Sequence, residues 1–551
     1  MNLIEQLHHN FHTYLTDTFG ISPEQARACT FTLNVDETKE AFGDISTNAA
    51  MVLAKQLKRN PIEIAKTITT QFTHTYIAKV EPAGPGFLNI FLTVPALQQI
   101  MQDLVTEKET FFKPSNLEHT HNVNIEFVSA NPTGPLHFGH GRGGIIGDVL
   151  GNILRFLGHK VTKEFYINDA GAQIAKLGMS LRIRCQQASG MHHLELPEEA
   201  YHGEYLVEVA QECLADYGPD VLDKPNEFFS DYAKAKLLER IKRTLTNFGI
   251  HFDVWFSEKS LHDQGLITEA LEIINKNGHL YEHEGALWLR STTFGDDKDR
   301  VVRKASGELT YVAADIAYLK NKIDRGFTKL LMTLGHDHHS YVVRLHAVQQ
   351  ALGLGQYPFD IILYQLVKIK EGDQQVRMSK RSGNMVTLDD VIETVGTDVA
   401  RFFYLNRKAD AQLEFDLELA LKKTEENPVY YVQYAYVRTK SILAKAAQEP
   451  ALQNLSKEDI AHISQAEALL IKKIVSLKTL LADITQHYQT HLLTYFALEL
   501  ATVFHRYYSK NRVIELEHPA TSRARLLMIT QLQETFAMIL TLIGISKPER
   551  M

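Results

Sequence analysis

A chain of 551 residues is long enough for three or four domains of ordinary size, each with its own buried core. Its 44% hydrophobic and 23% charged residues exclude a disordered chain, and no apolar stretch is expected to form a transmembrane helix. The formal net charge of −8 excludes a global positive field, so a nucleic-acid partner would have to be bound by local basic patches.

Cysteine usage and the first residues bear on the cellular compartment. Cys29, Cys185 and Cys213 are far apart and form no CxxC pair, which argues against a disulfide framework and against a thiolate zinc site. The chain starts with MNLIEQLHHNF, which has no basic region followed by an apolar one. We therefore expect no secretory signal and a cytoplasmic protein.

The first 115 residues mix helical and strand patterns. The turn-rich segment EPAGPG, residues 81–86, predicts a loop, and the alternating FLNIFL that follows, residues 87–92, predicts a short strand. We interpret residues 1–115 as a small N-terminal α+β domain.

A βαβ unit is predicted next. Residues 122–128 are rich in β-branched and aromatic side chains, residues 145–157 carry apolar side chains at helical spacing, and residues 160–167 again favour a strand. A strand, a loop, a helix and a second strand in this order predict the start of a parallel sheet.

The remaining elements complete this sheet and add a helical domain. Residues from about 175 to 290 are charged and mostly helical, which predicts an insertion, and strand patterns resume in residues 285–292, 308–315, 329–335 and 360–369. After about residue 405 the pattern is helical, and Asn427 and Pro428 are typical of a helix start. We predict an α/β sheet domain over residues 116–405 and an all-α bundle over residues 406–551.

The loop of the βαβ unit has the sequence SANPTGPLHFGHGRGG, residues 129–144. Ligands of open parallel sheets bind beyond the carboxyl ends of the strands, where a helix N-terminus attracts phosphate. His137 and His140 could donate hydrogen bonds to phosphate oxygens, and Gly139 would leave open space for a flat base. The alternatives are a chance histidine pair and a pair of metal ligands.

A second basic loop, VRMSKRSGN, covers residues 376–384 after a later strand. Lys380 and Arg381 could close over a triphosphate and neutralise the departing pyrophosphate. Taken alone, this segment would more often be an ordinary solvated turn.

Together these two loops resemble the HIGH and KMSKS motifs of the class I aminoacyl-tRNA synthetases, with Arg377 in the place of the first lysine of the second motif. The resemblance spans nearly the whole chain and is strongest to the arginyl-tRNA synthetases of the bacterial type. It implies a Rossmann-like catalytic domain, a C-terminal anticodon-binding domain and an N-terminal domain that touches the tRNA elbow. The segments that narrow it to this family are FYINDAGAQI, FDVWFSE, GHDHHSYVVRL, ENPVYYVQYAYVR, FHRYYSKNRV and KPERM.

The resemblance also implies a two-step reaction. The carboxylate of arginine attacks the α-phosphate of ATP, and the arginyl group of the adenylate then passes to the 3′-terminal adenosine of tRNA(Arg). It implies Mg²⁺ accompanying ATP, no protein-bound zinc, and activation only after tRNA is bound. The expected catalytic residues are His137, His140 and Lys380, and the expected ATP-binding residues are His137, Gly139, His140, Met378, Ser379, Lys380 and Arg381.

An arginine pocket needs a carboxylate and preferably a flat partner, because the guanidinium is planar and always charged. If a helix begins near Tyr311, this ring and the Asp315 carboxylate lie on one face of it, and the resemblance assigns both to arginine. Ordinary amphipathic packing is the alternative. Further candidates for arginine binding are Glu258, Ser129, Asn131 and His338. The alternative for Glu258 is an exposed loop glutamate, and the alternative for Ser129 and Asn131 is that they are turn residues.

Two segments suggest other functions. GHDHHS, residues 335–340, could be a metal site of a hydrolase, although no HExxH motif accompanies it. FHRYYSKNRV, residues 504–513, could bind RNA through phosphate and base contacts, or could be an amphipathic helix with tyrosines in the core. Its candidate tRNA-binding residues are Arg506, Tyr507, Lys510 and Arg512.

The chain is therefore expected to act on arginine, ATP and tRNA(Arg), as a monomer and without a membrane. The rival functions are a metal-dependent hydrolase, another HxGH enzyme that transfers an adenylyl group, and a non-catalytic RNA-binding protein. The last is disfavoured because both nucleotide loops are present.

Overall fold

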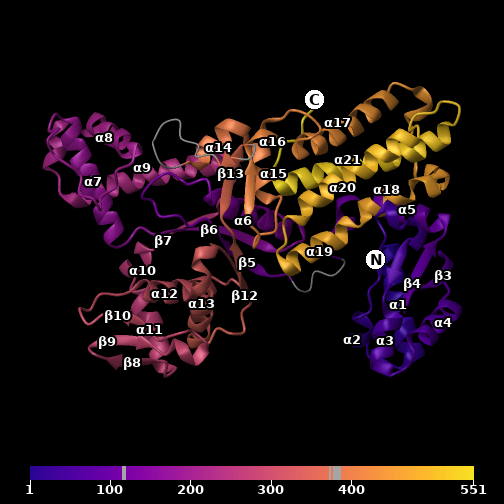
Figure 1. Ribbon diagram of the computed structural model, residues 1–551, viewed down its shortest axis with the longest axis horizontal. Helices are drawn as coiled ribbons and strands as arrows, with labels where there is room; N and C mark the ends of the chain where they lie inside the picture. The colour runs from indigo at the N-terminus through magenta and orange to yellow at the C-terminus, as the bar shows by residue number, and fades with distance from the viewer. Residues whose placement is uncertain (115–119, 372–373, 376–385) are drawn as a thin grey trace.

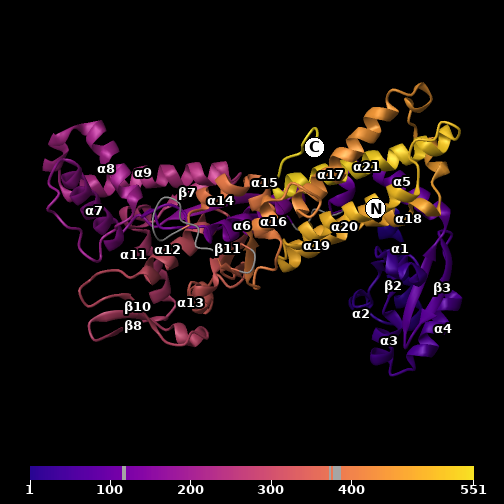
Figure 2. The same cartoon turned by 45° about the horizontal axis from the view of Figure 1, so that its top comes forward.

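The computed structural model describes residues 1–114, 120–371, 374–375 and 386–551. The molecule is elongated, with the N-terminal domain at one end and the parallel sheet in the middle (Figure 1). The other end is formed by helices α7 (Ala172–Ala188), α8 (Glu204–Tyr217) and α9 (Asn226–Asn247). The C-terminal helices lie along the sheet domain and reach the N-terminal domain, as the tilted view in Figure 2 also shows.

The N-terminal domain is built on a four-stranded antiparallel sheet with the order β1-β2-β4-β3. The predicted strand over residues 87–92 is confirmed as β4 (Phe87–Leu92). The other strands are β1 (Thr32–Leu33), β2 (Ile45–Thr47) and β3 (Ile77–Ala83), and the helices are α1 (Leu3–Phe19), α2 (Pro23–Arg27), α3 (Ala49–Leu57), α4 (Pro61–Gln71) and α5 (Val94–Glu107).

The predicted α/β fold is confirmed by a five-stranded parallel sheet with the order β12-β11-β5-β6-β7. Its strands are β5 (Asn122–Glu126), β6 (Lys160–Ile167), β7 (Val254–Ser257), β11 (Lys329–Gly335) and β12 (Phe359–Tyr364). Helices α6 (His140–Phe156), α12 (Tyr311–Asp324) and α13 (His339–Ala351) connect and cover them. The central strand β5 therefore ends at the loop that leads into α6, as the βαβ pattern predicts.

Helix α6 lies unusually close to the sheet because glycines face it. A Cβ atom added at Gly147 would lie 2.3 Å from Cγ of Phe127, and one added at Gly143 would lie 2.5 Å from Cε1 of Tyr364. Neither distance is compatible with a real side chain, so these two glycines are required for close packing of the helix.

The prediction that residues from about 175 to 290 form one mostly helical insertion is wrong. Strand β7 lies within this range and forms the edge of the main sheet, because Val254–Ser257 pair with β6. The first part is a helical unit with its own core, made of α7 (Ala172–Ala188), α8 (Glu204–Tyr217) and α9 (Asn226–Asn247). The second part is built from α10 (Lys259–Asp263), α11 (Leu266–Lys276) and a three-stranded sheet of β8 (Leu280–His283), β9 (Ala286–Leu289) and β10 (Arg300–Arg303).

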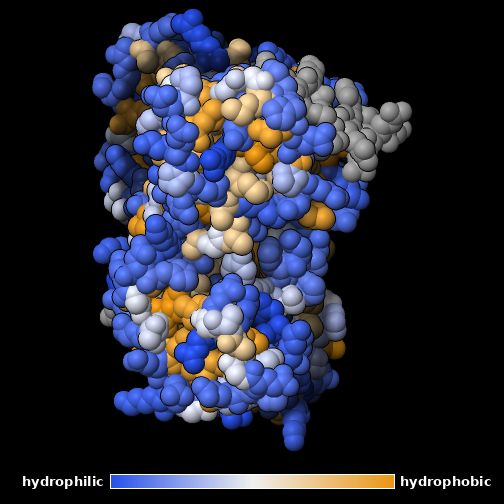
Figure 3. Space-filling view, turned by 90° about the vertical axis from the view of Figure 1, so that its left-hand side faces the viewer, coloured by the Kyte–Doolittle hydropathy of each residue, from blue (hydrophilic) through white to orange (hydrophobic). Residues whose placement is uncertain are grey.

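The strand expected over residues 308–315 is also wrong, because α12 begins at Tyr311. Alternating small and apolar side chains in this segment suit a buried helix as well as a strand, and packing on the sheet decides between them. Figure 3 shows the end of the molecule that carries these inserted elements, where hydrophobic patches are separated by hydrophilic side chains.

Between the sheet and the bundle lie β13 (Val367–Glu371), β14 (Gln374–Gln375), α14 (Leu388–Val395), α15 (Thr397–Leu405), β15 (Leu413–Asp416) and α16 (Leu417–Leu421). The predicted bundle follows as α17 (Pro428–Ala446), α18 (Ala468–Val475), α19 (Leu477–His487), α20 (Leu492–Lys510) and α21 (Pro519–Ile543). The predicted start of α17 is confirmed, since the Asn427 side chain accepts a hydrogen bond from the Val429 N–H and Pro428 occupies the first turn.

Helix α21 is long and apolar enough to cross a membrane by length and composition alone. In the fold it is a core helix of the bundle, and 61% of its most apolar window is buried inside the protein. Its apolar surface is therefore accounted for by packing against the neighbouring helices.

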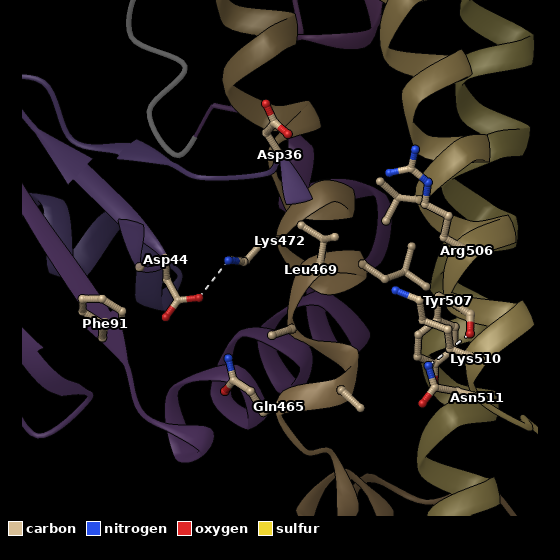
Figure 4. A pocket seen from close by; sticks show the side chains of 15 residues that line it. Asp36, Asp44, Phe91, Gln465, Leu469, Lys472, Arg506, Tyr507, Lys510 and Asn511 are labelled. Carbon is tan, nitrogen blue, oxygen red and sulfur yellow. Dashed lines mark hydrogen bonds and ion pairs between the residues drawn. The ribbon is translucent and has the colours of Figure 1, made fainter. Parts of the chain in front are cut away.

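The N-terminal domain docks on the bundle through a buried ion pair. Nζ of Lys472 lies 2.8 Å from a carboxylate oxygen of Asp44, and both side chains are buried (Figure 4). The second oxygen of Asp44 accepts a hydrogen bond from the Leu92 N–H. Since a buried charge is tolerated only when it is paired, this contact holds the two domains in one arrangement.

Candidate active site

The largest set of predicted site residues surrounds one cavity of about 720 Å³ at the carboxyl ends of the parallel strands. This is the position at which open α/β sheets bind ligands, and the volume suits a nucleotide with a small substrate. The predicted residues that line it are Ser129, Asn131, His137, Gly139, His140, Glu258, Tyr311, Asp315 and His338.

The HFGH segment comprises residues 137–140, and hydrogen bonds hold each of its two histidines in a defined tautomer. Nδ1 of His140 accepts a hydrogen bond from the His137 N–H at 3.0 Å, and Nδ1 of His137 accepts one from the Gly139 N–H at 3.2 Å. Burial lowers the pKa of both imidazoles, so they are neutral near pH 7. Each ring therefore carries its proton on Nε2, from which it can donate a hydrogen bond to a ligand oxygen.

The backbone of the loop before HFGH is strained. Val128 and Ser129 have φ values of 67° and 41°, in the left-handed region that side chains other than glycine rarely adopt. The strained turn is secured because Oγ of Ser129 donates to Glu126 at 3.0 Å and accepts from the Tyr166 N–H at 3.1 Å. Ser129 thus shapes the cavity wall, while the Asn131 amide bonds Gln173 at 2.9 Å beside the opening.

Open space remains next to Gly139. A Cβ atom added there would meet only the His137 ring, at 3.2 Å from Nδ1. A planar group can approach the backbone at this position, whereas a side chain would fill the space.

The HFGH segment is joined to the chain that follows the second basic loop. The Leu388 N–H donates to Leu136 O at 2.8 Å, and the Phe138 N–H donates to Val386 O at 3.1 Å. The predicted ATP-binding residues Met378, Ser379, Lys380 and Arg381 lie outside the described residues. The described chain resumes at Val386, which these two hydrogen bonds place beside the HFGH segment.

The opposite side of the cavity is acidic. Burial raises the pKa of Glu258 to about 7, with a further contribution from the Asp315 charge. Burial likewise raises the pKa of Asp315 to about 7, and the nearby Glu126 charge adds to this effect. A positive charge bound beside these two carboxyl groups would lower both pKa values again.

Sequence reasoning missed three residues of this acidic side. Tyr341 on α13 donates its hydroxyl hydrogen bond to Asp315, and the Arg344 guanidinium lies 4.6 Å from the centre of the Tyr341 ring. Glu126, at the end of β5, is buried and paired at 2.6 Å with Lys322. Glu126 could have been suspected from its place at a strand end, but Tyr341 and Arg344 carry no local signal.

The exposed Tyr311 stands at the cavity rim one helical turn before Asp315, as its spacing predicts. His338 lies beside Asp337, with 3.5 Å between Nε2 and the carboxylate, and both side chains are largely exposed. Within residues 1–114, 120–371, 374–375 and 386–551, no group of three or more His, Cys, Asp or Glu side chains is arranged to hold a metal ion.

The four candidate RNA-binding residues do not share one surface. Tyr507 is 5% exposed and its hydroxyl donates to Glu467 at 3.0 Å, so most of its ring is packed inside the bundle. Arg506, Tyr507 and Lys510 line one pocket between α20 and the N-terminal domain (Figure 4). Arg512 lines a separate cavity of about 520 Å³ in the bundle.

Three sequence profiles match the chain in succession. "Arginyl tRNA synthetase N terminal domain" covers residues 5–92, "tRNA synthetases class I (R), catalytic domain" covers residues 99–412, and "DALR anticodon binding domain" covers residues 432–551. The central profile alone spans more than half of the chain, and it contains the whole cavity. The chain belongs to the class I arginyl-tRNA synthetases.

Similar proteins support the assignment of the chain to this family. The chain is 40% identical over 519 residues to the arginine–tRNA ligase of Bacillus subtilis and 42% identical over 520 residues to that of Moorella thermoacetica. Each alignment covers 93% of this synthetase, and 93% and 92% of the two relatives. Arginyl-tRNA synthetases from Thermus thermophilus (TM-score 0.76, 20% identity) and Plasmodium falciparum (TM-score 0.78, 16% identity) share its fold over the full length of both chains.

This synthetase is an arginine–tRNA ligase that uses ATP. Its substrates are arginine, ATP and tRNA, and its C-terminal helices are the anticodon-binding domain of the family. The identification as an arginyl-tRNA synthetase with a parallel-sheet catalytic domain, predicted from the sequence motifs, is thereby confirmed.

Proposed function

We propose that the guanidinium of arginine binds between Asp315 and Glu258, with the Tyr311 ring beside it at the cavity rim. The supporting observation is the pair of carboxyl groups whose pKa values burial raises to about 7. A planar cation with several N–H donors would satisfy both groups at once. Ser129, Asn131 and His338 also line the cavity, and in this proposal they bind the amino and carboxylate groups of arginine.

ATP occupies the other half of the cavity in this proposal. Its adenine lies over Gly139, and its α-phosphate faces Nε2 of His137 and His140. When the carboxylate oxygen of arginine attacks the α-phosphorus, the bond to the leaving pyrophosphate breaks, and the two imidazole donors stabilise the negative charge that builds on the phosphate oxygens. No side chain needs to form a covalent intermediate.

The second basic loop supplies cations for the departing pyrophosphate, through Lys380 and Arg381 with Met378 and Ser379 beside them. Support comes from the hydrogen bonds between Val386 and Leu388 and the HFGH segment, because these two residues follow the loop closely in the chain. Mg²⁺ carried with ATP would neutralise further phosphate charge.

The tRNA is proposed to lie along the bundle, with its anticodon loop near Arg512. The 520 Å³ cavity there is lined by basic and aromatic side chains, and the Arg438 guanidinium lies 4.6 Å from the centre of the Tyr508 ring. Such a combination binds phosphates and stacks on unpaired bases. We propose tRNA(Arg) as the cognate substrate, a monomer as the active species, and the cytoplasm as its location.

The arginine pocket is tested by Asp315→Ala. This variant should lose arginine-dependent ATP–pyrophosphate exchange in the presence of tRNA, while its equilibrium affinity for ATP changes less than about threefold, since Asp315 lies on the acidic side of the cavity. Asp324→Ala, on the same helix but at its other end, is the matched control and should leave exchange unchanged. Undiminished exchange by Asp315→Ala would refute the assignment.

A further inference from the structure

One short helix connects the HFGH segment with the end of the anticodon-binding domain. Helix α15 lies between α6 and the end of α21 (Figures 1 and 2). Asp398, Arg401 and Tyr404 are spaced three residues apart and therefore follow one side of the helix. Each of them bonds to a different part of the protein.

Tyr404 supports the HFGH segment from behind. Its side chain is fully buried, and its hydroxyl donates to Phe138 O at 2.7 Å, in the middle of the segment. Its ring also lies against the first turn of α6, since a Cβ atom added at Gly141 would be 2.9 Å from two of the ring carbons. The position of the two flanking histidines thus depends on a side chain that lies outside the cavity lining.

Arg401, one turn earlier, holds the end of α21. Its guanidinium is fully buried and donates to Ile543 O at 2.9 Å and 2.7 Å. It also donates to Phe248 O, at the end of α9, at 2.8 Å, and forms an ion pair with Asp148 of α6. The carbonyl ends of two helices carry partial negative charge, so a buried cation between them is well placed to join them.

Asp398, at the start of α15, holds the tail that follows α21. Its carboxylate accepts a hydrogen bond from the Ser546 N–H at 2.9 Å and another from Nε2 of Gln433, on α17, also at 2.9 Å. The same helix therefore grips the C-terminal domain at two points and the HFGH segment at a third.

We propose that Tyr404 is a positioning residue for His137 and His140, and that α15 makes this position depend on the end of the C-terminal domain. The inference rests on the proposed role of the two histidines. A helix of nine residues moves as a rigid unit, so a displacement of α21 passes through Arg401 to the Tyr404 hydroxyl and to Phe138 O. Binding of tRNA to the bundle has by this route a direct mechanical connection to the ATP site.

Tyr404→Phe tests the first part, because it removes one hydroxyl and keeps the ring. We expect kcat for tRNA-dependent ATP–pyrophosphate exchange to fall about fivefold to tenfold, the effect of one lost hydrogen bond, while KM for arginine stays within about twofold. Tyr488→Phe is the matched control, since it removes a hydroxyl bonded at 2.6 Å to Asp360, away from the HFGH segment. An unchanged kcat, or an equal loss in the control, would overturn the positioning role.

Asp398→Asn and the double variant Asp398→Asn/Tyr404→Phe test whether α15 couples the C-terminal domain to the HFGH segment. Asp398→Asn should lower kcat about twofold to fivefold through a weakened hold on the tail. If α15 transmits position, the loss of kcat in Asp398→Asn/Tyr404→Phe is smaller than the product of the two single losses. Losses that multiply fully would refute the coupling. His140→Ala is measured alongside, and unchanged exchange by this variant would instead refute the proposed role of the histidines.

Discussion

Lowering the pH from 8 to 6 is expected to weaken arginine binding to this synthetase by about tenfold to a hundredfold. The perturbation acts on Asp315 and Glu258, whose pKa values burial raises to about 7. Both groups must be ionised to bind the guanidinium. Because arginine favours the ionised form, affinity is full above pH 7 and is lost as the pH falls through 7.

The magnitude follows from the titration. With a pKa of about 7, a carboxyl group is ionised in about one molecule in eleven at pH 6 and in about ten of eleven at pH 8. One such group lowers the affinity about tenfold over this range, and two independent groups would lower it about a hundredfold. Since the two charges repel each other, the protons leave in coupled steps and the slope falls between these limits.

Calorimetric titration of the enzyme with arginine, in the presence of tRNA, measures this linkage. Titrations at pH 6.5 in two buffers of different ionisation enthalpy should show release of at least about half a proton per arginine bound. Glu258→Gln removes one titrating group, so its pH dependence should be shallower. An affinity that stays constant between pH 6 and pH 8, with no proton release, would show that the cavity does not bind arginine through these carboxyl groups.

Three further outcomes follow from other contacts. Asp169→Asn should raise KM for arginine several-fold with little change in kcat, as measured by steady-state kinetics. The reason is that the Asp169 carboxylate accepts hydrogen bonds from Ser257 Oγ and the Lys259 N–H, on either side of Glu258. Gly147→Ala should lower the free energy of unfolding by about 1–3 kcal/mol in urea titrations, since its Cβ would overlap a buried ring, and unchanged stability would contradict the close packing of α6. Arg512→Ala should weaken tRNA binding and reduce its salt dependence, a result that filter binding at several salt concentrations would reveal.

Local patterns predicted the elements that position the site. The alternation of residues 87–92, the helical spacing after HFGH and the cap at Asn427 all depend on neighbours within a few positions, and all three are confirmed. The failures share a physical cause. Val254–Ser257 and the segment at Tyr311 are short and apolar, so a strand and a helix are equally compatible with their pattern until a packing partner is known.

The RNA-binding prediction shows a similar limit. Alternating aromatic and basic side chains on α20 are compatible with an RNA-binding face and with an ordinary buried one. Helical rotation places Tyr507 in the core and Tyr508 at the basic cavity, although the two are adjacent in the chain. Only the packing of the bundle distinguishes them.

The amino-acid sequence by itself determined the family of this protein, because its matches to the family profiles depend only on the order of the residues along the chain. Only the tertiary structure decided the pKa values of the carboxyl groups in the cavity. Asp315 and Glu258 come from different segments, and their pKa values depend on burial and on the charges of neighbouring carboxylates, Glu126 for Asp315 and Asp315 for Glu258, which only the fold brings together. The support of HFGH by Tyr404, 266 residues away in the chain, is likewise a property of the folded state.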